Sequence, residues 1–388
     1  MRILVFSLET INNAGDEILG ATTEYLIRRV CGNAEIKRSQ LMPTWNNAKG
    51  FQKIKWLVGT LLRKGSKLIP FNTASYWVKN FAMNMSYRDI YEEQIRTADK
   101  IMFSIGQLKY STQNFSYVFY LINKLCTENE KTVLMSAMSP QAFNTKDWRC
   151  RQLVEAVNFP CLKMITTRDG QHGVDVLRSS YLKRDVQCDY VGDPALWIPD
   201  VYQIKQRRKE TVPYIGINII REYLFKDYER DFTDKQLQDV YEGLVALLQR
   251  KNWKWCLFCN GMAEDWHVIR KLKKKLNISD EHIMPIPANG EEYVNMVAQF
   301  DAVFGARLHC CITSVALGIP VVSFLWEDKI RYFFDTMKIS QFLFEPTDMS
   351  PQKIFSAIEA AMQHAFDFEN RDSYKHKTLE SIQKYIFM

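Results

Sequence analysis

The sequence lacks several features that would each point to a particular class of protein. It contains no run of about 18 apolar residues, so we expect no membrane-spanning helix. The loop at residues 12–17 has neither the three-glycine dinucleotide fingerprint nor a phosphate-loop lysine, which argues against nicotinamide and nucleoside-triphosphate chemistry. The net charge of +7 comes without a basic region interleaved with stacking aromatics. We therefore expect no nucleic-acid groove.

Cysteine is present, but it shows no disulfide framework. The nine cysteines, an odd number, are scattered through apolar segments, which is typical of reduced thiols in the cytoplasm. Residues 1–7 are too short for the apolar region of a signal peptide and indicate a first strand. Cys256 and Cys259 have metal-ligand spacing, but no second pair follows and both lie in an expected buried strand. We expect a cytoplasmic protein without a metal site.

The length and the apolar pattern indicate two α/β domains. A chain of 388 residues is long for one hydrophobic core, and 47% hydrophobic with 24% charged residues is typical of a soluble globular protein. Short apolar runs alternate with longer amphipathic ones, which predicts two doubly wound, Rossmann-like domains facing a cleft. The expected strands are 2–7, 34–38, 100–105, 131–136, 163–167, 186–191, 213–220, 254–259, 283–286, 301–304 and 321–325.

The same pattern gives the expected helices and boundaries. We expect an N-terminal domain over 1–200 with a helical insertion at about 42–98, a linker within 203–211, a C-terminal domain over 201–345, and a helical segment over 346–388 that packs across the domains. The expected helices outside the insertion are 17–31, 235–250, 264–276, 291–299, 309–317 and 353–366.

Basic residues gather in the segment 53–67, where they alternate with apolar ones. This pattern predicts an amphipathic helix with two interpretations. In the first, the apolar side faces the core and the basic side faces solvent. In the second, the helix lies on a membrane surface and attaches the protein reversibly and in a salt-sensitive way to the inner face of the membrane. The residues concerned are Lys53, Lys55, Arg63, Lys64 and Lys67, with Trp56, Leu57, Leu61 and Leu62.

The most informative stretch is Gly305-Ala306-Arg307-Leu308-His309, which follows the apolar run 302–304. A strand that delivers an arginine and a histidine to the start of a helix builds an anion site, because free N–H groups and the helix dipole favour negative charge there. The guanidinium fork of Arg307 suits phosphate or carboxylate, and His309 can donate or accept a proton near neutral pH. Binding an anion and moving a proton in one place suggests a transferase whose substrate carries phosphate.

Two further strand-to-helix turns carry candidate residues. Asp16 lies in the first loop, either as an ordinary carboxylate at a helix N-terminus or as a group that orients substrate hydroxyls. Arg168 directly follows the expected strand 163–167, either in a surface arrangement with Asp169 or as a second anion-binding arginine. The carboxyl ends of parallel strands are where such folds bind ligands, so we expect both loops at the cleft.

These residues carry a family resemblance over roughly residues 1–340, with the strongest block at 301–329. The chain resembles the polysaccharide pyruvyl transferase family in Asn13-Ala14-Gly15-Asp16, Thr167-Arg168-Asp169, Asp193-Pro194-Ala195, Arg307-Leu308-His309, Gly318-Ile319-Pro320 and Lys329. The resemblance implies a glycosyltransferase-B-like fold and transfer of pyruvate from phosphoenolpyruvate to a sugar. It also implies that Arg307, Leu308 and His309 serve phosphoenolpyruvate binding and catalysis. Where the family usually has a glycine cluster, this sequence keeps only Gly106, which puts the backbone approach to ligand in question.

The resemblance implies a ketal-forming pyruvyltransferase of cell-surface or exopolysaccharide biosynthesis, such as capsule or cell-wall polymer. His309 is then the general acid, Arg307 and Arg168 hold carboxylate and phosphate, and Asp16 serves an acceptor hydroxyl. Lys329 either completes the phosphate pocket or is a surface lysine. The remaining expected binding residues are Leu308, Asn13, Gly15 and Gly106.

The expected partners are phosphoenolpyruvate, on the side of the C-terminal domain, and a saccharide acceptor on the side of the N-terminal domain. The acceptor is lipid-linked, nucleotide-linked or polymeric, and the chemistry demands no cofactor. Because fold does not determine function, two alternatives stay open. One is a glycosyltransferase that uses a nucleotide sugar, and the other is a non-catalytic protein that binds an anion or glycan.

Overall fold

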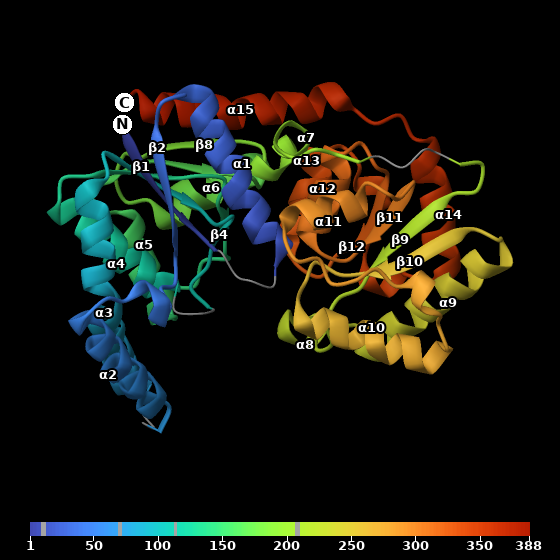
Figure 1. Cartoon of the computed structure of the whole chain (residues 1–388), viewed down its shortest axis with the longest axis horizontal. Helices are drawn as coiled ribbons and strands as arrows, with labels where there is room; N and C mark the ends of the chain where they lie inside the picture. The colour runs from blue at the N-terminus through green and yellow to red at the C-terminus, as the bar shows by residue number, and fades with distance from the viewer. Residues whose placement is uncertain (9–12, 69–71, 112–114, 206–209) are drawn as a thin grey trace. The chain divides into compact units, whose positions relative to one another are not determined.

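The computed structural model of the protein describes residues 1–8, 13–68, 72–111, 115–205 and 210–388. The chain divides into two compact units (Figure 1). Unit 1 comprises Met1–Leu8, Leu26–Val191 and Leu379–Met388, and unit 2 comprises Glu9–Tyr25 and Gly192–Thr378. The division thus falls before the expected linker 203–211, of which residues 206–209 lie outside the described part of the chain.

Unit 1 is built on a six-stranded parallel sheet with the order β2-β1-β3-β5-β7-β8. Residues 3–6 of β1 are all buried, as expected of a central parallel strand that is covered on both faces. The strand order reverses direction between β1 and β3, so the carboxyl ends of these two strands form the topological switch point of the sheet. The strands are β1 (Arg2–Ser7), β2 (Glu35–Gln40), β3 (Lys100–Ser104), β5 (Thr132–Met135), β7 (Leu162–Thr167) and β8 (Gln187–Tyr190).

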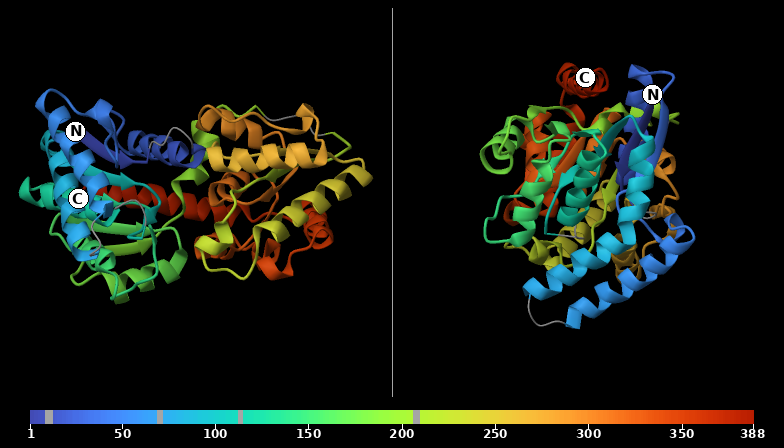
Figure 2. Two further views of the ribbon diagram at one scale, coloured as in Figure 1. Left: turned by 90° about the horizontal axis from the view of Figure 1, so that it is seen from below. Right: turned by 90° about the vertical axis from the view of Figure 1, so that its left-hand side faces the viewer.

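The helices of unit 1 include the expected insertion as a helical hairpin. Helices α2 (Phe51–Gly65) and α3 (Asn72–Thr97) contact each other and lie side by side (Figure 2). Within α2, Gly59 is buried and Trp56 packs against the apolar cluster of unit 1, whereas other apolar residues of the helix stay exposed, so the core-facing interpretation holds for only part of the helix. The other helices are α4 (Phe115–Glu128), α5 (Trp148–Val157) and α6 (Gly170–Val176), and a two-stranded ribbon pairs β4 (Gln107–Leu108) with β6 (Ser139–Pro140).

Unit 2 repeats this plan with a five-stranded parallel sheet in the order β10-β9-β11-β12-β13. Its topological switch point lies at the carboxyl ends of β9 and β11. Helices α12 (Leu308–Ala316) and α14 (Pro351–Gln363) both contact β11 and β12. Helix α11 (Gly290–Val297) packs beside α12 and α9 (Asp234–Arg250) beside α14, which indicates that helices cover both faces of the sheet. The strands are β9 (Tyr214–Asn218), β10 (Lys254–Phe258), β11 (Ala302–Gly305), β12 (Val321–Phe324) and β13 (Leu343–Phe344).

The helices of unit 2 begin close to where their sequence signals place them. Thr233 and Gln236 form a capping box at the start of α9, and the Asn289 side chain accepts a hydrogen bond from the Glu292 amide at the start of α11. The helices are α7 (Ile198–Val201), α8 (Leu224–Asp227), α9 (Asp234–Arg250), α10 (Ala263–Leu276), α11 (Gly290–Val297), α12 (Leu308–Ala316), α13 (Asp328–Thr336) and α14 (Pro351–Gln363).

Two helices divide between the units. Residues 14–25 of α1 (Ala14–Val30) count with unit 2 and its last turn with unit 1, while α15 (Phe368–Ile386) passes from unit 2 to unit 1 at residue 379. Each unit has its own buried apolar cluster, and Ile18 and Leu19 of α1 belong to the cluster of unit 2. The start of α1 is therefore part of the unit that holds Arg307.

Some expectations about individual elements are wrong. The expected strand 283–286 is reduced to an isolated bridge between Leu257 and Ile283, because Pro285 has no backbone N–H with which to continue a ladder. The sequence analysis also missed α13, and it gave no bounds for α15. The two parallel, doubly wound sheets confirm the α/β class, whereas the expected cleft stays a prediction. Among the described residues, no helix is long and apolar enough to cross a bilayer.

Candidate active site

Arg307 lies at the topological switch point of unit 2, where β11 ends and α12 begins. It is the N-cap residue of α12, with an extended backbone (φ −105°, ψ 142°). Its Nε and Nη2 donate to the two carboxylate oxygens of Asp265, at 2.6 and 2.7 Å. The Asp265 side chain is 0% exposed and that of Arg307 15%. This bidentate ion pair is largely shielded from solvent, and it fixes the plane of the guanidinium.

The ion pair with Asp265 determines the charge of Arg307 and the N–H groups that remain for a ligand. Burial disfavours its charge, but the adjacent Asp265 carboxylate outweighs burial and raises the pKa of Arg307 above its usual value. The guanidinium therefore stays positive at any pH at which the protein is folded. Because Asp265 takes one proton each of Nε and Nη2, both protons of Nη1 and the second proton of Nη2 are left for a ligand. The binding of phosphate or carboxylate by the fork of Arg307 therefore stays a prediction.

An asparagine network holds the backbone at this point. The Oδ1 of Asn218, the last residue of β9, accepts from the amides of Ala306 and Arg307 at 3.3 and 3.1 Å. Its Nδ2 donates to Oδ1 of Asn260 at 3.0 Å. The Asn260 carbonyl in turn accepts from the Ala14 amide at the start of α1, at 2.9 Å. The network thus joins the ends of β9, β10 and β11 to the first residue of α1.

His309 lies against the start of α1, which explains the glycine there. A Cβ at Gly15 would clash with the imidazole ring of His309 and would lie 2.7 Å from its Cβ. Only glycine lets the two segments approach this closely. The His309 Nε2 is buried. The structure thus brings together Gly15 and His309, two residues that are 294 positions apart in the chain.

Asn13 and Asp16 shape the first turn of α1. Asn13 Nδ2 donates to the Asp16 carboxylate at 2.9 Å, and Asn13 Oδ1 accepts from the Gly15 amide at 3.3 Å. Asp16 is buried and lies in the first turn of the helix, where the dipole favours its negative charge. Both interpretations of Asp16 remain compatible with this position. Asn12, which belongs to the same loop, lies outside the described residues.

Lys329 and Leu308 occupy different surroundings from those expected. Lys329 is not a surface lysine, because its side chain is 12% exposed and pairs with Glu327 at 2.5 Å. Its Nζ also lies 5.4 Å from the ring centroid of Trp326, whose Nε1 donates to the Ala306 carbonyl at 2.6 Å. Lys329 is thereby connected to the Arg307 turn through Trp326. Leu308 belongs to the apolar core of unit 2, so its side chain serves packing.

Unit 1 carries a second arginine at a strand end, Arg168, directly after β7. Arg168 is buried, and its Nε donates to the Ser139 hydroxyl at 3.0 Å. The same hydroxyl donates to the Asp169 carboxylate at 2.7 Å. A surface arrangement of Arg168 and Asp169 is therefore wrong, because both side chains are buried. Arg168 remains a candidate for binding an anion.

Gly106 lies at the switch point of unit 1, two residues after β3, and contacts the Arg168 side chain. Its backbone is left-handed, with φ of +62°, and a Cβ there would lie 2.7 Å from Nη1 of Arg168. Both conditions require glycine. The reduced glycine cluster therefore retains the one glycine that approaches the arginine.

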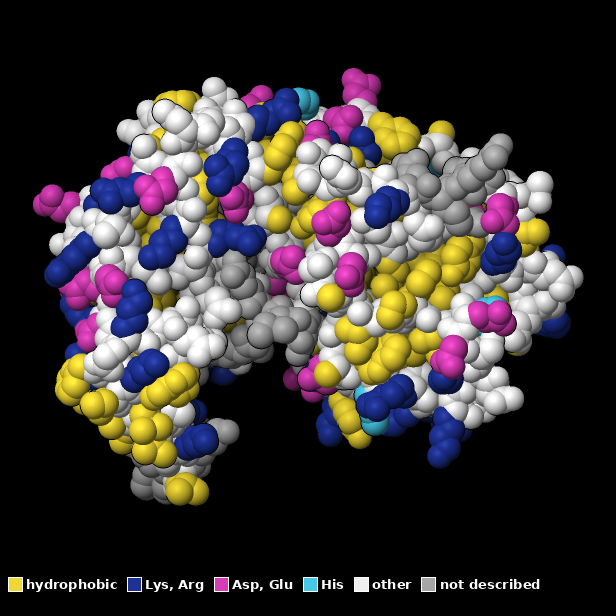
Figure 3. Space-filling view, viewed as in Figure 1, with side chains coloured by type: hydrophobic (Ala, Val, Ile, Leu, Met, Phe, Trp, Pro, Cys, Tyr) yellow, Lys and Arg dark blue, Asp and Glu magenta, His cyan; other side chains and the backbone are white. Residues whose placement is uncertain are grey.

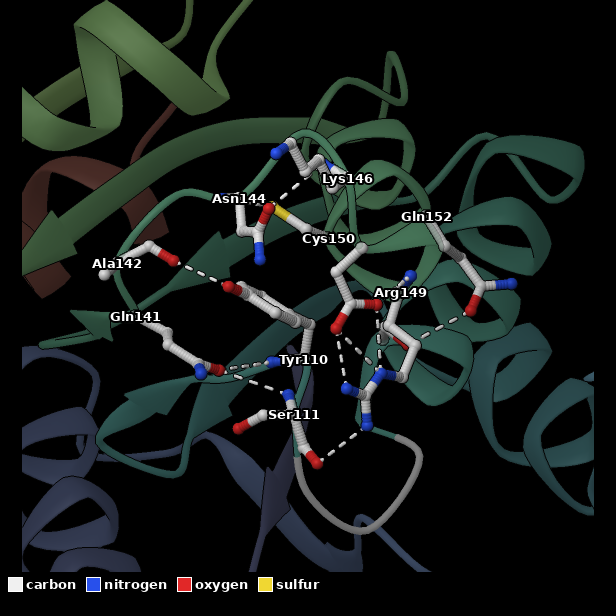
Figure 4. A network of polar contacts seen from close by, with 11 residues as sticks. Tyr110, Ser111, Gln141, Ala142, Asn144, Lys146, Arg149, Cys150 and Gln152 are labelled. Carbon is white, nitrogen blue, oxygen red and sulfur yellow. Dashed lines mark hydrogen bonds and ion pairs between the residues drawn. The ribbon is translucent and has the colours of Figure 1, made fainter. Parts of the chain in front are cut away.

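The loop that follows Gly106 is held by side chains from a neighbouring loop (Figure 4). Gln141 Oε1 accepts from the amides of Tyr110 and Ser111, at 3.1 and 3.2 Å, and the Tyr110 hydroxyl donates to the Ala142 carbonyl at 2.8 Å. Arg149 Nη1 donates to the Ser111 carbonyl at 3.0 Å while its Nε and Nη2 grip Asp147. These bonds fix the chain on the carboxyl side of Gly106.

Three buried cysteines of unit 2 have thiols that are hard to deprotonate and are therefore poor nucleophiles. Burial raises the pKa of Cys256 and Cys259 to about 11, and of Cys311 to about 12. All nine cysteines are free thiols, and no group of three His, Cys, Asp or Glu side chains in the described part of the chain is arranged to hold a metal ion. We assign Cys310 and Cys311 to packing beneath the Arg307 turn, where both are fully buried.

Sequence reasoning missed the residues that hold Arg307 in place. Asp265 lies in the first turn of a helix that was expected, and its role depends on a contact 42 residues along the chain. Asn260 directly follows an expected strand, and Asn218 is a polar residue in an apolar run. The rule that pointed to Arg307, polar residues at the carboxyl end of a parallel strand, would also have found Asn260, whereas the expected strand 213–220 placed Asn218 inside the strand.

Comparisons with known proteins agree with this architecture. The chain is similar in structure to UDP-GlcNAc 2-epimerase from Methanocaldococcus jannaschii, with a TM-score of 0.60, 9% identity and 100% of each chain covered. It is similar to UDP-GlcNAc 2-epimerase from Neisseria meningitidis, with a TM-score of 0.57, 11% identity, and 100% of this chain and 98% of that chain covered. The lipopolysaccharide outer core galactosyltransferase WaaB gives a TM-score of 0.52 at 11% identity, covering 100% of this chain and 99% of the other. These likenesses confirm the glycosyltransferase-B-like fold.

The sequence itself was compared with curated proteins and with protein families. No curated protein matches it significantly. The family model described as polysaccharide pyruvyl transferase matches residues 13–328. This match covers most of the chain and includes the start of α1, Arg168 and the turn from Arg307 to His309. The chain therefore belongs to the polysaccharide pyruvyl transferase family.

Proposed function

We propose that this protein transfers pyruvate from phosphoenolpyruvate to a pair of sugar hydroxyls as a ketal, in the biosynthesis of a cell-surface or secreted polysaccharide. Membership of the family supports pyruvyl transfer to a saccharide in general. The observation that carries the proposal is the turn at the start of α12, where a permanently charged arginine and a histidine stand two residues apart. An anionic donor and a proton-transfer step need these two groups together.

Arg307 binds the anionic part of phosphoenolpyruvate in this proposal. The Asp265 carboxylate fixes the guanidinium, so Nη1 and the remaining N–H of Nη2 are held ready for a phosphate or carboxylate oxygen without further ordering. The first turn of α12, a helix of nine residues, adds backbone N–H groups and a dipole that favour an anion. Lys329 is a second cation near this turn and serves the phosphate.

His309 acts as the general acid. The reaction adds a proton to the CH2 carbon of phosphoenolpyruvate, and the adjacent carbon then bonds to one acceptor oxygen. Phosphate leaves as that carbon bonds to the second acceptor oxygen. Of the two hydroxyl protons released, one replaces the proton given by the acid and the other leaves with phosphate, so atoms and charge balance. A positioned acid of this kind contributes about 10²- to 10⁴-fold to the rate.

The remaining candidates serve the acceptor or the donor's second anionic group. Asp16 accepts from an acceptor hydroxyl and is oriented by Asn13, whose amide already bonds its carboxylate. Arg168 binds an anionic group of the substrates, with its side chain oriented by Ser139 and Gly106. Free thiols throughout the chain support a cytoplasmic place of action.

The variants that test this proposal must keep the buried ion pair. Replacing Arg307 with alanine would leave Asp265 buried and unpaired, which would destabilise the fold and obscure the result. Arg307→Lys keeps a positive charge beside Asp265 but loses the fork, and His309→Gln keeps size and polarity but cannot act as an acid. We expect phosphoenolpyruvate to raise the melting temperature of the wild type and of His309→Gln, and to raise it much less in Arg307→Lys.

Activity is measured as phosphate released from phosphoenolpyruvate in the presence of lipid-linked, nucleotide-linked and polymeric saccharides. His309→Gln should lower turnover by about 10²-fold or more with little change in phosphoenolpyruvate affinity. Stabilisation by UDP-sugars, with none by phosphoenolpyruvate, would contradict the proposal and favour glycosyl transfer. Binding of phosphoenolpyruvate without phosphate release for any acceptor would favour a non-catalytic binding protein.

A further inference from the structure

The hairpin of α2 and α3 exposes an apolar stripe that a soluble surface helix would normally bury. The stripe on α2 follows a spacing of three to four residues, so it runs along one face of the helix. Phe51 is 69% exposed, Leu61 60%, and Trp77 on α3 67%. Figure 3 shows hydrophobic side chains gathered over these helices. The exposed members are Phe51, Ile54, Leu57, Val58, Leu61, Leu68, Trp77 and Phe81, which we call the apolar stripe.

The segment that carries the apolar stripe also carries the positive charge of the chain. Between Ile36 and Arg88 there are ten basic residues and no acidic one. The whole chain has a net charge of +7, so the remainder of the molecule has a net charge of −3. Lys37 and Arg38 lie on β2, and α3 continues with Asp89, Glu92 and Glu93. The hairpin itself, residues 51–97, has eight basic and three acidic residues, and its net charge of +5 is most of the +7 of the chain.

The lysines beside the apolar stripe are only partly neutralised by their surroundings. On α3, Asp89 pairs with Lys55 at 2.6 Å and Glu93 pairs with Lys49 at 3.7 Å. Lys53 lies 5.3 Å from the ring centroid of Trp45. In the described part of the chain Lys53, Lys64 and Lys79 form no ion pair. These three cations flank the exposed apolar side chains and are available to an anionic partner.

We propose that the α2–α3 hairpin docks on the surface of a membrane that contains anionic lipids. The apolar stripe enters the boundary between headgroups and acyl chains, and the flanking lysines bind lipid phosphates. A helix of 15 residues is about 22 Å long, so α2 can lie flat in the interface along its whole length. This inference stands on the hairpin alone and does not depend on the proposed reaction.

The positive charge and the exposed apolar side chains of the hairpin together favour an anionic membrane over a second copy of the chain or a nucleic acid as the partner. A second copy of the chain would bring the same basic surface against itself in a symmetric dimer, which like charges oppose. A nucleic acid would attract the lysines but would give no reason for aliphatic side chains such as Leu61 and Ile54 to stay exposed. An anionic bilayer satisfies both the charge and the apolar surface.

The test uses the full chain and vesicles of phosphatidylcholine with or without phosphatidylglycerol, separated by sedimentation. We expect binding to the anionic vesicles at 50 mM salt, at least tenfold weaker binding to the neutral vesicles, and release at 500 mM salt. Leu61→Asp and Trp77→Asp should each reduce binding to anionic vesicles at least tenfold, and Lys64→Glu several-fold. Because these side chains are exposed, the variants should keep the melting temperature of the wild type.

Matched variants in unit 2 serve as controls. Ile286→Asp changes an exposed apolar residue, 43% exposed, and Lys274→Glu reverses an exposed charge on the basic helix α10. Both should bind vesicles like the wild type. The proposal is overturned if no anionic vesicle binds at low salt, or if Leu61→Asp and Trp77→Asp bind as well as the controls. It is equally overturned if the chain forms a dimer that Leu61→Asp dissociates while vesicle binding is absent.

Discussion

Arg307 and Arg168 both lie near the carboxyl end of a parallel strand, but different groups hold them. Arg168 directly follows β7 and Arg307 lies two residues after β11, at the edge where sheets of this kind bind ligands. The Arg307 guanidinium is gripped through two nitrogens by the buried Asp265 carboxylate, whereas Nε of Arg168 donates to the hydroxyl of Ser139. Strand-end position therefore predicts where an arginine lies, while long-range contacts decide how firmly it is fixed.

A glycine completes each site, again in two different ways. Gly15 makes room for the His309 ring at the start of a helix, whereas Gly106 adopts a left-handed backbone and makes room for the Arg168 guanidinium. A clash with a packed imidazole is harder to relieve than one with the end of a flexible arginine. We therefore expect unit 2 to respond more strongly than unit 1 to the same type of substitution.

The largest expected effect comes from breaking the ion pair of unit 2. Asp265→Asn removes the charge that balances Arg307 and leaves a buried guanidinium without its partner. We expect the free energy of unfolding, measured by denaturant titration, to fall by about 3–5 kcal/mol. Asp280→Asn is the control, because its carboxylate is 90% exposed and pairs with Lys273 at the surface, a contact worth about 0–1 kcal/mol. Equal stability of the two variants would show that Asp265 does not hold the site.

The second substitution tests the contact between α1 and His309. Gly15→Ala places a methyl group on the imidazole, so either the ring or the start of α1 must move. We expect a loss of about 3 kcal/mol in unfolding free energy, at the upper end of the range for overpacking, together with loss of pyruvyl transfer. Gly32→Ala is matched to it, since a Cβ there lies 3.8 Å from its nearest neighbour, the Arg28 carbonyl. If both variants kept full activity, His309 would not depend on α1 for its position.

These first two substitutions also show what the sequence could and could not predict. The α/β class, most strands and the turn from Arg307 to His309 follow from local pattern, because apolar periodicity and strand-end polarity are local signals. The residues that contact that turn cannot be predicted from local pattern. Asp265 is 42 residues from Arg307 in the chain and Gly15 is 294 residues from His309, and no local sequence pattern indicates contacts over such separations.

The α2–α3 hairpin and the expected strand at 283–286 also show that a local pattern does not determine tertiary contacts. Amphipathic periodicity correctly predicted a helix at α2, but periodicity alone does not say what lies against its apolar face. The apolar run at 283–286 has strand-like composition, yet the proline within it stops the ladder. The sequence therefore predicted that α2 is a helix but not which of its residues are buried. It likewise showed that residues 283–286 are apolar but not whether they pair with another strand.

The third substitution examines the glycine of unit 1. Gly106→Ala forces a left-handed backbone on a residue with a Cβ, which costs about 1–2 kcal/mol, and it presses on Nη1 of Arg168. We expect that loss in unfolding free energy and weaker binding of the anionic substrate by calorimetry. Gly65→Ala is the control, because a Cβ there would meet no atom of the described residues within 4 Å beyond its own helix backbone and its chain neighbours. A loss of stability equal to that of Gly15→Ala would remove the difference between the two glycines.

The smallest expected effect comes from the hydroxyl that holds Arg168. Ser139→Ala deletes one acceptor for Arg168 Nε and one donor to Asp169, but it leaves both charged groups in place. We expect unfolding free energy to fall by about 1 kcal/mol, the usual value of a hydrogen bond, with Ser111→Ala as a control whose hydroxyl forms no hydrogen bond to the described residues. Substrate affinity should weaken only slightly, because Gly106 still borders the guanidinium. A loss as large as that of Asp265→Asn would mean that a hydroxyl fixes one arginine as firmly as a carboxylate fixes the other.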